Sequence, residues 1–344
     1  MNTSAPHREL VADYDLPQMP CTTPPRIHPY YPHIRALHAE WVNRHLPRKP
    51  GGALPRAIAH IDPMWDAMFL PFGDTERLFH HACLTSTNIE LDDTAIAHRD
   101  RFDAVLGDTA FVEAESAAND DPYTRAYRLI WHTIRTTAPS ERVYRRMRMA
   151  WRSWIDAALV ENEIRAAGKP IDLDAVLRLR QESVCMRTYF VGSEYVLNID
   201  AGDITTTDPE VLRAIEIGIT HVTLTNDIYS YRKEYFFNDP ISAIFALRNA
   251  HGQGLQQAID TVYGMLAALD REQADLLERV HARYAGHPLG ERLHQCFDNY
   301  RAISSGHVQA CLETPRYNGR GYVWDGMRSR RVTVQSERLP LETV

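Results

Sequence analysis

The stretch ITHVTLTNDIYSYRKE, residues 219–234, decides how this sequence is interpreted. Its first half is largely apolar, whereas its second half carries polar side chains at helical spacing. Because each helical residue advances by about 100°, Ser230 lies about 40° and Glu234 about 80° from Asn226. Lys233 falls about 20° to the other side of Asn226. The stretch therefore predicts a helix with an amide, a hydroxyl, a carboxylate and an ammonium group on one face.

These side chains on one face suit a particular chemistry. Amide, hydroxyl and carboxylate oxygens are hard ligands of the kind that Mg²⁺ prefers. The neighbouring lysine could then bind a phosphate that the metal also bridges. A solvated polar face is the alternative interpretation. The apolar residues upstream favour a face that continues into a cavity or core.

A second acidic feature lies in the segment STNIELDDTAIA, residues 86–97. Asp92 and Asp93 are adjacent, so on a helix they point about 100° apart and only one can follow a given face. We expect Asp92 to be the metal ligand of the two. Taken alone, such a pair is also typical of surface residues or helix caps.

The composition limits the classes of protein that this chain can represent. It has 344 residues, 44% of them hydrophobic, and a formal net charge of −7, which argues against nucleic acid as the main partner. No apolar run approaches the roughly 20 residues of a membrane-spanning helix, and we expect no secretory signal. Five widely spaced cysteines form no CxxC pair, so a reduced, cytoplasmic setting fits best.

Helical spacing dominates the chain, and alternating strand patterns are nearly absent. We therefore predict an all-α fold with an irregular N-terminal arm over residues 1–28 and a helical domain over residues 29–317. A polar tail over residues 318–344 is a candidate lid. Ser140 and Asp208 are expected to start helices, and Gly168 to end one. The expected helices after the first, at about residue 31, cover residues 75–97, 122–138, 140–167, 172–197, 208–236, 240–250, 253–284 and 288–312.

Several motifs occur in an order that resembles the order found in the microbial class I terpene synthases. Asn226, Ser230 and Glu234 match the metal-binding triad of that family, and the Asp92–Asp93 pair resembles the start of its aspartate-rich motif. The segment RLRQES resembles the one that carries the family's diphosphate-sensing arginine. Its arginine, Arg180, lies 46 residues before the triad. Thr314–Tyr317 resembles the C-terminal Arg-Tyr pair, and the resemblance spans about residues 25–317.

The resemblance implies a single class I terpenoid synthase-like helical bundle around a deep apolar cavity. The cavity mouth would hold three Mg²⁺ and a prenyl diphosphate substrate. In that family the metal ions and fixed cations stabilise the negative charge that develops on diphosphate, and a dry cavity protects the carbocation. A homodimer is one assembly state that stays open. By resemblance, the metal ligands are Asp92, Asn226, Ser230 and Glu234, and the diphosphate ligands are Arg180, Lys233, Arg316 and Tyr317.

Some positions depart from the family pattern or modify it. Thr94, Ala95 and Ile96 follow the aspartate pair where a further acidic residue is usual, which puts the supporting salt bridges in doubt. Asp93 could pair with Arg316 in a closed state. Ser183 and Val184 are the equivalents of the family's linker and effector positions. The residues expected to line the cavity are Asn88, Ile89, Val222 and Ala310, and the aromatic rings that could join them are Trp65, Phe69, Phe190 and Tyr229.

The leading hypothesis is a terpene cyclase that acts on farnesyl or geranylgeranyl diphosphate. A chain-elongating prenyltransferase would need a second aspartate-rich motif where this chain has the triad. A diphosphate-binding protein without turnover is the non-enzymatic alternative, suggested by the incomplete aspartate motif. Ala310, in place of the tryptophan of many relatives, together with Asn88 and Ile89, indicates a roomy cavity. The sequence therefore leans slightly towards the twenty-carbon substrate.

Overall fold

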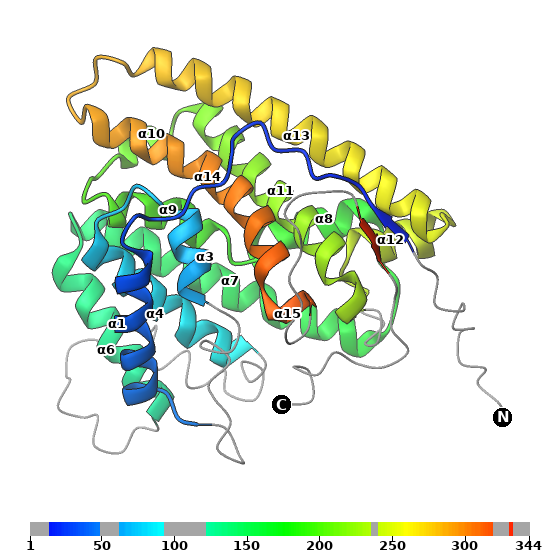
Figure 1. The fold of residues 1–344 in the computed structure, drawn as a ribbon, viewed down its shortest axis with the longest axis horizontal. Helices are drawn as coiled ribbons and strands as arrows, with labels where there is room; N and C mark the ends of the chain where they lie inside the picture. The colour runs from blue at the N-terminus through cyan, green and yellow to red at the C-terminus, as the bar shows by residue number, and fades with distance from the viewer. Residues whose placement is uncertain (1–13, 49–61, 93–121, 235–239, 319–329, 333–344) are drawn as a thin grey trace.

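The protein is a bundle of α-helices with one short two-stranded sheet, as seen in a computed structural model (Figure 1). The structure describes residues 14–48, 62–92, 122–234, 240–318 and 330–332. The all-α prediction is confirmed. The elements are β1 (Tyr14–Leu16), α1 (Tyr31–His45), α3 (Asp62–Phe69), α4 (Thr75–Asp92), α6 (Pro122–Thr137), α7 (Glu141–Ala167), α8 (Leu173–Ser183), α9 (Arg187–Val196), α10 (Gly202–Thr205), α11 (Pro209–Glu234), α12 (Ala243–His251), α13 (Leu255–Arg283), α14 (Glu291–Glu313), α15 (Pro315–Asn318) and β2 (Arg330–Val332).

Local signals in the sequence set several helix ends. The Ser140 hydroxyl accepts a hydrogen bond from the Val143 N–H at 3.1 Å, which caps the start of α7. The Asp208 carboxylate accepts from the Glu210 N–H at 2.8 Å at the start of α11. Gly168 ends α7 in the left-handed conformation, with φ of 61°. These three predictions are confirmed.

The single helix predicted over residues 172–197 is wrong, because it is split into α8 and α9. Cys185 lies in the break with φ of 66°, and a left-handed residue cannot continue a right-handed helix. The Val184 N–H still reaches the Arg180 carbonyl oxygen at 3.4 Å, so the helix ends there and the chain turns sharply. The break brings Ser183, Val184 and Cys185 to the wall of the cavity described below.

Helix α3 was not expected from the sequence, yet it packs closely against α14. Gly306 of α14 makes the approach possible, since a Cβ atom there would lie 2.5 Å from the Met68 carbonyl oxygen of α3. The contact fixes how α14 passes beside α3. It therefore helps to place Trp65 of α3 and His307 of α14 on the same cavity.

The predicted irregular arm and polar tail meet in a small antiparallel sheet. Strand β1 of the arm pairs with β2 of the tail, with Tyr14 opposite Val332 and Leu16 opposite Arg330. The Tyr14 ring packs edge-on against Tyr231 of α11 at a centroid distance of 5.7 Å. The expectation of a wholly irregular arm is thus wrong at residues 14–16, because burial of Tyr14 and Leu16 stabilises an extended conformation there.

Among the described helices, none combines the length and the apolar character that crossing a bilayer requires.

Candidate active site

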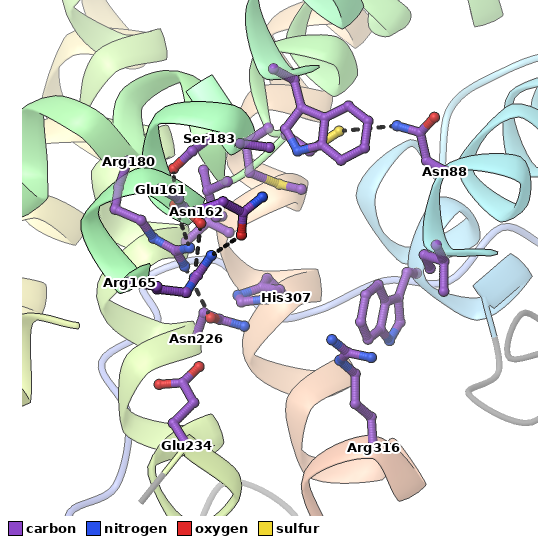
Figure 2. A pocket seen from close by; sticks show the side chains of 18 of the residues that line it. Asn88, Glu161, Asn162, Arg165, Arg180, Ser183, Asn226, Glu234, His307 and Arg316 are labelled. Atoms are coloured by element: carbon purple, nitrogen blue, oxygen red, sulfur yellow. Dashed lines mark hydrogen bonds and ion pairs between the residues drawn. The ribbon is translucent and has the colours of Figure 1, made fainter. Parts of the chain in front are cut away.

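A cavity of about 770 Å³ lies within the bundle, which is within the usual range for a small-molecule site. Aromatic rings from three helices form much of its wall: Trp65 and Phe69 of α3, Trp151 and Trp154 of α7, and Tyr189 of α9. Polar side chains from α7, α8 and α11 gather on one side of it, and Arg316 of α15 points inward from the opposite side (Figure 2). The remaining lining residues used below are Thr85, Asn88, Ile89, Glu161, Asn162, Arg165, Arg180, Ser183, Val184, Cys185, Val222, Asn226, Glu234, His307, Arg316 and Tyr317.

The cavity-lining predictions divide into two groups. Asn88, Ile89 and Val222 line the cavity as expected. Ala310 does not, because its side of α14 faces the hydrophobic core, where it is fully buried. The placement of Ala310 on the cavity wall was therefore wrong.

Of the four aromatic residues that were expected to be able to line the cavity, two do so and two do not. Trp65 and Phe69 line the cavity. Phe190 instead packs edge-on against Tyr300 in the core, with ring centroids 5.0 Å apart. Tyr229 belongs to a second core cluster and is 5% exposed. Core packing is therefore the role of the last two rings.

The Asn226 amide joins three parts of the sequence at the polar part of the cavity. Its Oδ1 accepts a hydrogen bond from Arg180 Nη2 at 3.1 Å. Its Nδ2 donates to the Tyr317 hydroxyl at 2.7 Å. Helices α8, α11 and α15 thus contribute one residue each to a single hydrogen-bonded unit. The sequence resemblance grouped these three side chains, and the structure brings them together.

The other two members of the triad lie along the same helix as Asn226. The Ser230 hydroxyl donates to the Asn226 carbonyl oxygen at 2.6 Å, one turn back, and the residue is 1% exposed. Ser230 is not among the residues that line the cavity in the described chain. Glu234 does line the cavity, and its carboxylate points towards Asn226 (Figure 2). Lys233 belongs to α11, but its side chain lies outside the described part.

The donors on α11 that could hold Mg²⁺ are oxygen atoms of different kinds. Within the described residues no three His, Cys, Asp or Glu side chains come together as a metal site by themselves. The Asn226 amide oxygen has two lone pairs, and it can accept from Arg180 and also face a cation. The Ser230 hydroxyl oxygen keeps lone pairs while it donates to the backbone. With the Glu234 carboxylate these groups form an all-oxygen set that fits Mg²⁺.

The aspartate pair is only partly described. Asp92 is the last residue of α4, and the position of its side chain lies outside the described structure. Asp93 lies entirely outside it. The proposed pairing of Asp93 with Arg316 stays a prediction.

Arg180 is held by groups from three directions. Besides Asn226, its guanidinium lies 3.5 Å from Glu161 Oε1 of α7 and 3.8 Å from Asp227 Oδ1 of α11. Glu161 is 6% exposed, pairs with Arg165 at 2.9 Å and accepts a hydrogen bond from the Ser183 hydroxyl. These contacts fix the position of the Arg180 guanidinium at the polar part of the cavity.

Glu161, Arg165 and Asp227 were missed at the sequence level. Glu161 and Arg165 are four residues apart on one helix, a spacing that is usual for an exposed ion pair and signals no site. Asp227 follows Asn226 directly, but its Oδ2 accepts a hydrogen bond from the Ala243 N–H at 2.7 Å. Asp227 therefore ties α11 to the first turn of α12.

The Arg-Tyr pair occupies the short helix α15. Tyr317 is buried, and its ring stacks on Trp65 with centroids 6.5 Å apart. Burial raises the pKa of the Tyr317 phenol, so the hydroxyl stays neutral and able to donate. Arg316 lines the cavity, and its guanidinium points inward from the side opposite Arg180 (Figure 2). Arginines from three helices thus line the cavity: Arg165 of α7, Arg180 of α8 and Arg316 of α15.

Comparison with known proteins gives the family. The model of terpene synthase family 2, C-terminal metal binding, matches residues 84–271. The chain is 22% identical over 321 residues to (E)-2-epi-beta-caryophyllene synthase of Selaginella moellendorffii, covering 90% of this chain and 86% of the relative. It is 25% identical over 138 residues to a sesquiterpene synthase of Piloderma croceum, covering 39% and 40%.

Solved structures share the fold. The crystal structure of a-eudesmol synthase superposes with a TM-score of 0.73 at 20% identity, covering 85% of this chain and 98% of that one. At this identity the likeness supports the architecture alone. The family model, however, matches more than half of the chain and includes α8 and α11, which carry Arg180 and Asn226. The protein therefore belongs to terpene synthase family 2, within the class I terpene synthases, and has their all-α fold.

Proposed function

We propose that the protein is an Mg²⁺-dependent terpene cyclase that ionises a linear prenyl diphosphate and cyclises the resulting carbocation. The observation that carries the proposal is the Asn226 unit, in which one amide holds Arg180 and Tyr317 beside an aromatic-lined cavity. The cavity thus has a cationic polar end around Asn226 and Arg180 and an apolar chamber lined by the aromatic rings. These two parts match the diphosphate head and the hydrocarbon chain of a prenyl diphosphate.

The residues at the polar end have separate roles in this proposal. Asn226, Ser230, Glu234 and Asp92 would hold Mg²⁺, which when bound would supply electrostatic stabilisation of the leaving diphosphate. Arg180 and Arg316 bind diphosphate oxygens through their forked N–H groups, and the neutral Tyr317 hydroxyl donates another hydrogen bond. Lys233 adds a point charge. These fixed donors stabilise negative charge as the C–O bond breaks.

The chamber beyond the polar end protects the cation. Trp65, Phe69, Trp151 and Tyr189 present aromatic surface to the cavity. Ring faces attract a carbocation electrostatically, and apolar walls exclude the water that would quench it. The cavity contour then selects which carbons come close enough to bond.

Fifteen-carbon farnesyl diphosphate is the substrate that we propose. The slight preference for a longer substrate rested partly on Ala310, which does not line the cavity. A relative from Piloderma croceum carries the name sesquiterpene synthase, and sesquiterpenes are fifteen-carbon products. Both points favour the shorter chain.

Substrate preference gives a direct prediction. We expect kcat/KM for farnesyl diphosphate to exceed that for geranylgeranyl diphosphate by at least about tenfold, or ~1.4 kcal/mol. Ile89→Ala should narrow the difference, because Ile89 lines the cavity and its truncation adds room for more methylenes. Steady-state kinetics with both diphosphates would measure this. A clear wild-type preference for the twenty-carbon substrate would contradict the assignment.

The reaction class itself is tested by incubation with Mg²⁺ and ten-, fifteen- and twenty-carbon diphosphates, with products read by mass spectrometry. A cyclised hydrocarbon or alcohol supports the proposal. A longer linear diphosphate would indicate a chain-elongating prenyltransferase. Binding without turnover would indicate a diphosphate-binding protein. None of the five cysteines, all within the described residues, forms a disulfide, and we propose a reducing, cytoplasmic setting.

The tail is proposed to act as a lid over the polar end. Its described residues are Asn318, at the end of the helix α15 that carries Arg316 and Tyr317, and β2. We expect Mg²⁺ with inorganic diphosphate to increase hydrogen-exchange protection at residues 315–318 and 330–332, since ligand charges draw the arginines inward. The middle of α13 serves as an internal reference that should not change. Equal protection with and without ligand would contradict a lid.

A further inference from the structure

One cavity-lining side chain has no role in the chemistry above. His307 of α14 lies between the polar side chains of α8 and α11 and the inward-pointing Arg316 (Figure 2). The residue is 4% exposed, and its ring packs edge-on against Phe69 with centroids 5.8 Å apart. Because Phe69 belongs to the aromatic wall and Arg316 lies on α15, beyond the end of α14, His307 lines the cavity where its aromatic and polar parts meet.

The ring of His307 keeps a lone pair. Its hydrogen-bonding partner among the described residues is the Cys311 thiol, whose sulfur lies 3.5 Å from Nε2 and 3.9 Å from Nδ1. We assign the ring N–H to Nε2, which lies nearer the sulfur and donates to it as a weak acceptor, so that Nδ1 keeps its lone pair. Burial, with His221 and Arg180 nearby, lowers the pKa of His307 to about 3. The imidazole is therefore neutral at physiological pH.

Other acceptors on the wall are already engaged. Glu161 is paired with Arg165 and bonded to Ser183. Glu234 lies at the polar end, where we assign it to the metal. The hydroxyls of Thr85 and Tyr189 are 3.0 Å from each other, and hydroxyl oxygens are much weaker bases than imidazole nitrogen. Among the described lining residues, His307 is thus the neutral nitrogen base that faces the chamber.

We propose that His307 is the base that ends the reaction by taking a proton from the cyclised carbocation. The C–H bond next to the cationic carbon breaks, its electron pair becomes the new C=C bond, and the proton moves to the free ring nitrogen. The imidazolium then gives the proton to the released diphosphate, which Arg180 holds nearby. A carbocation is so strong an acid that even a weakly basic imidazole accepts its proton. This inference rests on the proposed cyclase function.

The test separates ionisation from termination. His307→Phe keeps a planar ring of similar size and removes the lone pair. We expect diphosphate release to stay within about threefold of wild type, while the wild-type alkene falls by at least about 10²-fold, at the low side of a general base's contribution. Alkenes with a different double-bond position, or alcohols, should replace it. Diphosphate release and product composition are measured on the same samples.

Two further variants separate basicity from cavity shape. His307→Gln retains hydrogen-bonding groups without a basic nitrogen and should shift products in the same way. His307→Gly leaves a space in which added imidazole should restore the wild-type alkene. The matched control is His221→Phe. His221 is fully buried on α11, does not line the cavity, and its ring nitrogens have no hydrogen-bond partner among the described residues. That variant should leave the products unchanged.

The outcomes keep the two proposals apart. Wild-type protein that forms no cyclised product contradicts the cyclase function itself. Wild-type cyclisation with the same alkene from His307→Phe overturns the role of His307. Loss of diphosphate release in that variant also overturns it, because His307 would then act before termination. Failure of imidazole to change the products of His307→Gly would show that ring shape alone matters.

Discussion

Asn226→Ala and Glu234→Ala should each lower kcat/KM for the prenyl diphosphate by about 10²–10³-fold, because each removes a fixed oxygen ligand at the site of developing charge. The fold should survive, since both side chains line the cavity and are only partly buried. Turnover at saturating Mg²⁺ and the thermal melting temperature are the two measurements. An Mg²⁺ titration should also show a weaker apparent metal affinity in both variants.

The same helix offers a control for these substitutions. Glu216 lies on α11, is exposed and pairs with Arg213 at 3.6 Å on the surface. Glu216→Ala should therefore leave turnover and metal affinity unchanged. If both Asn226→Ala and Glu234→Ala keep near wild-type turnover, the assignment of the triad is wrong.

Arg180→Ala should cause a loss of similar size, about 10²–10³-fold in kcat, because a cation aimed at the leaving group acts mainly in the transition state. The fold should tolerate the change. Glu161 keeps its partners Arg165 and Ser183, so no buried carboxylate loses all its contacts. Single-turnover kinetics would place the defect in the ionisation step.

Arg178 provides the matched control for Arg180. It lies on the same helix two residues away, and its side chain is exposed. Arg178→Ala should preserve turnover and the affinity for inorganic diphosphate, whereas Arg180→Ala should weaken that affinity. Equal behaviour of the two variants would show that Arg180 is an ordinary basic residue of α8.

Much of the site could be predicted because its residues occur at informative spacings. Asn226, Ser230 and Glu234 recur at helical intervals in one strongly patterned stretch, and the structure places them along α11. Arg180 and Tyr317 lie 46 and 91 residues from Asn226, and the family resemblance brought them into one hypothesis before the hydrogen bonds were seen. Helix-capping residues such as Ser140 were predictable from local chemistry alone.

The errors come from features that depend on three-dimensional packing. Cys185 adopts a left-handed conformation that a non-glycine residue rarely takes, so nothing in the sequence marks the end of α8. Ala310 is small and apolar, a description that fits a cavity wall and a tight core equally well. Glu161 reaches Arg180 across two helices, and only the relative placement of α7 and α8 reveals this contact. His307 gave no motif because a lone buried histidine has no spacing to recognise.

The pairing of β1 with β2 brings two distant parts of the chain together (Figure 1). Tyr14 and Val332 are neighbours across the strands, so the chain between them forms a nearly closed loop. Such proximity is what circular permutation requires, since a short linker could join the two strands while new termini open in a surface connection. Rearranged chains of this kind would allow the arm and the tail to be fused, shortened or released independently of the helices that form the cavity.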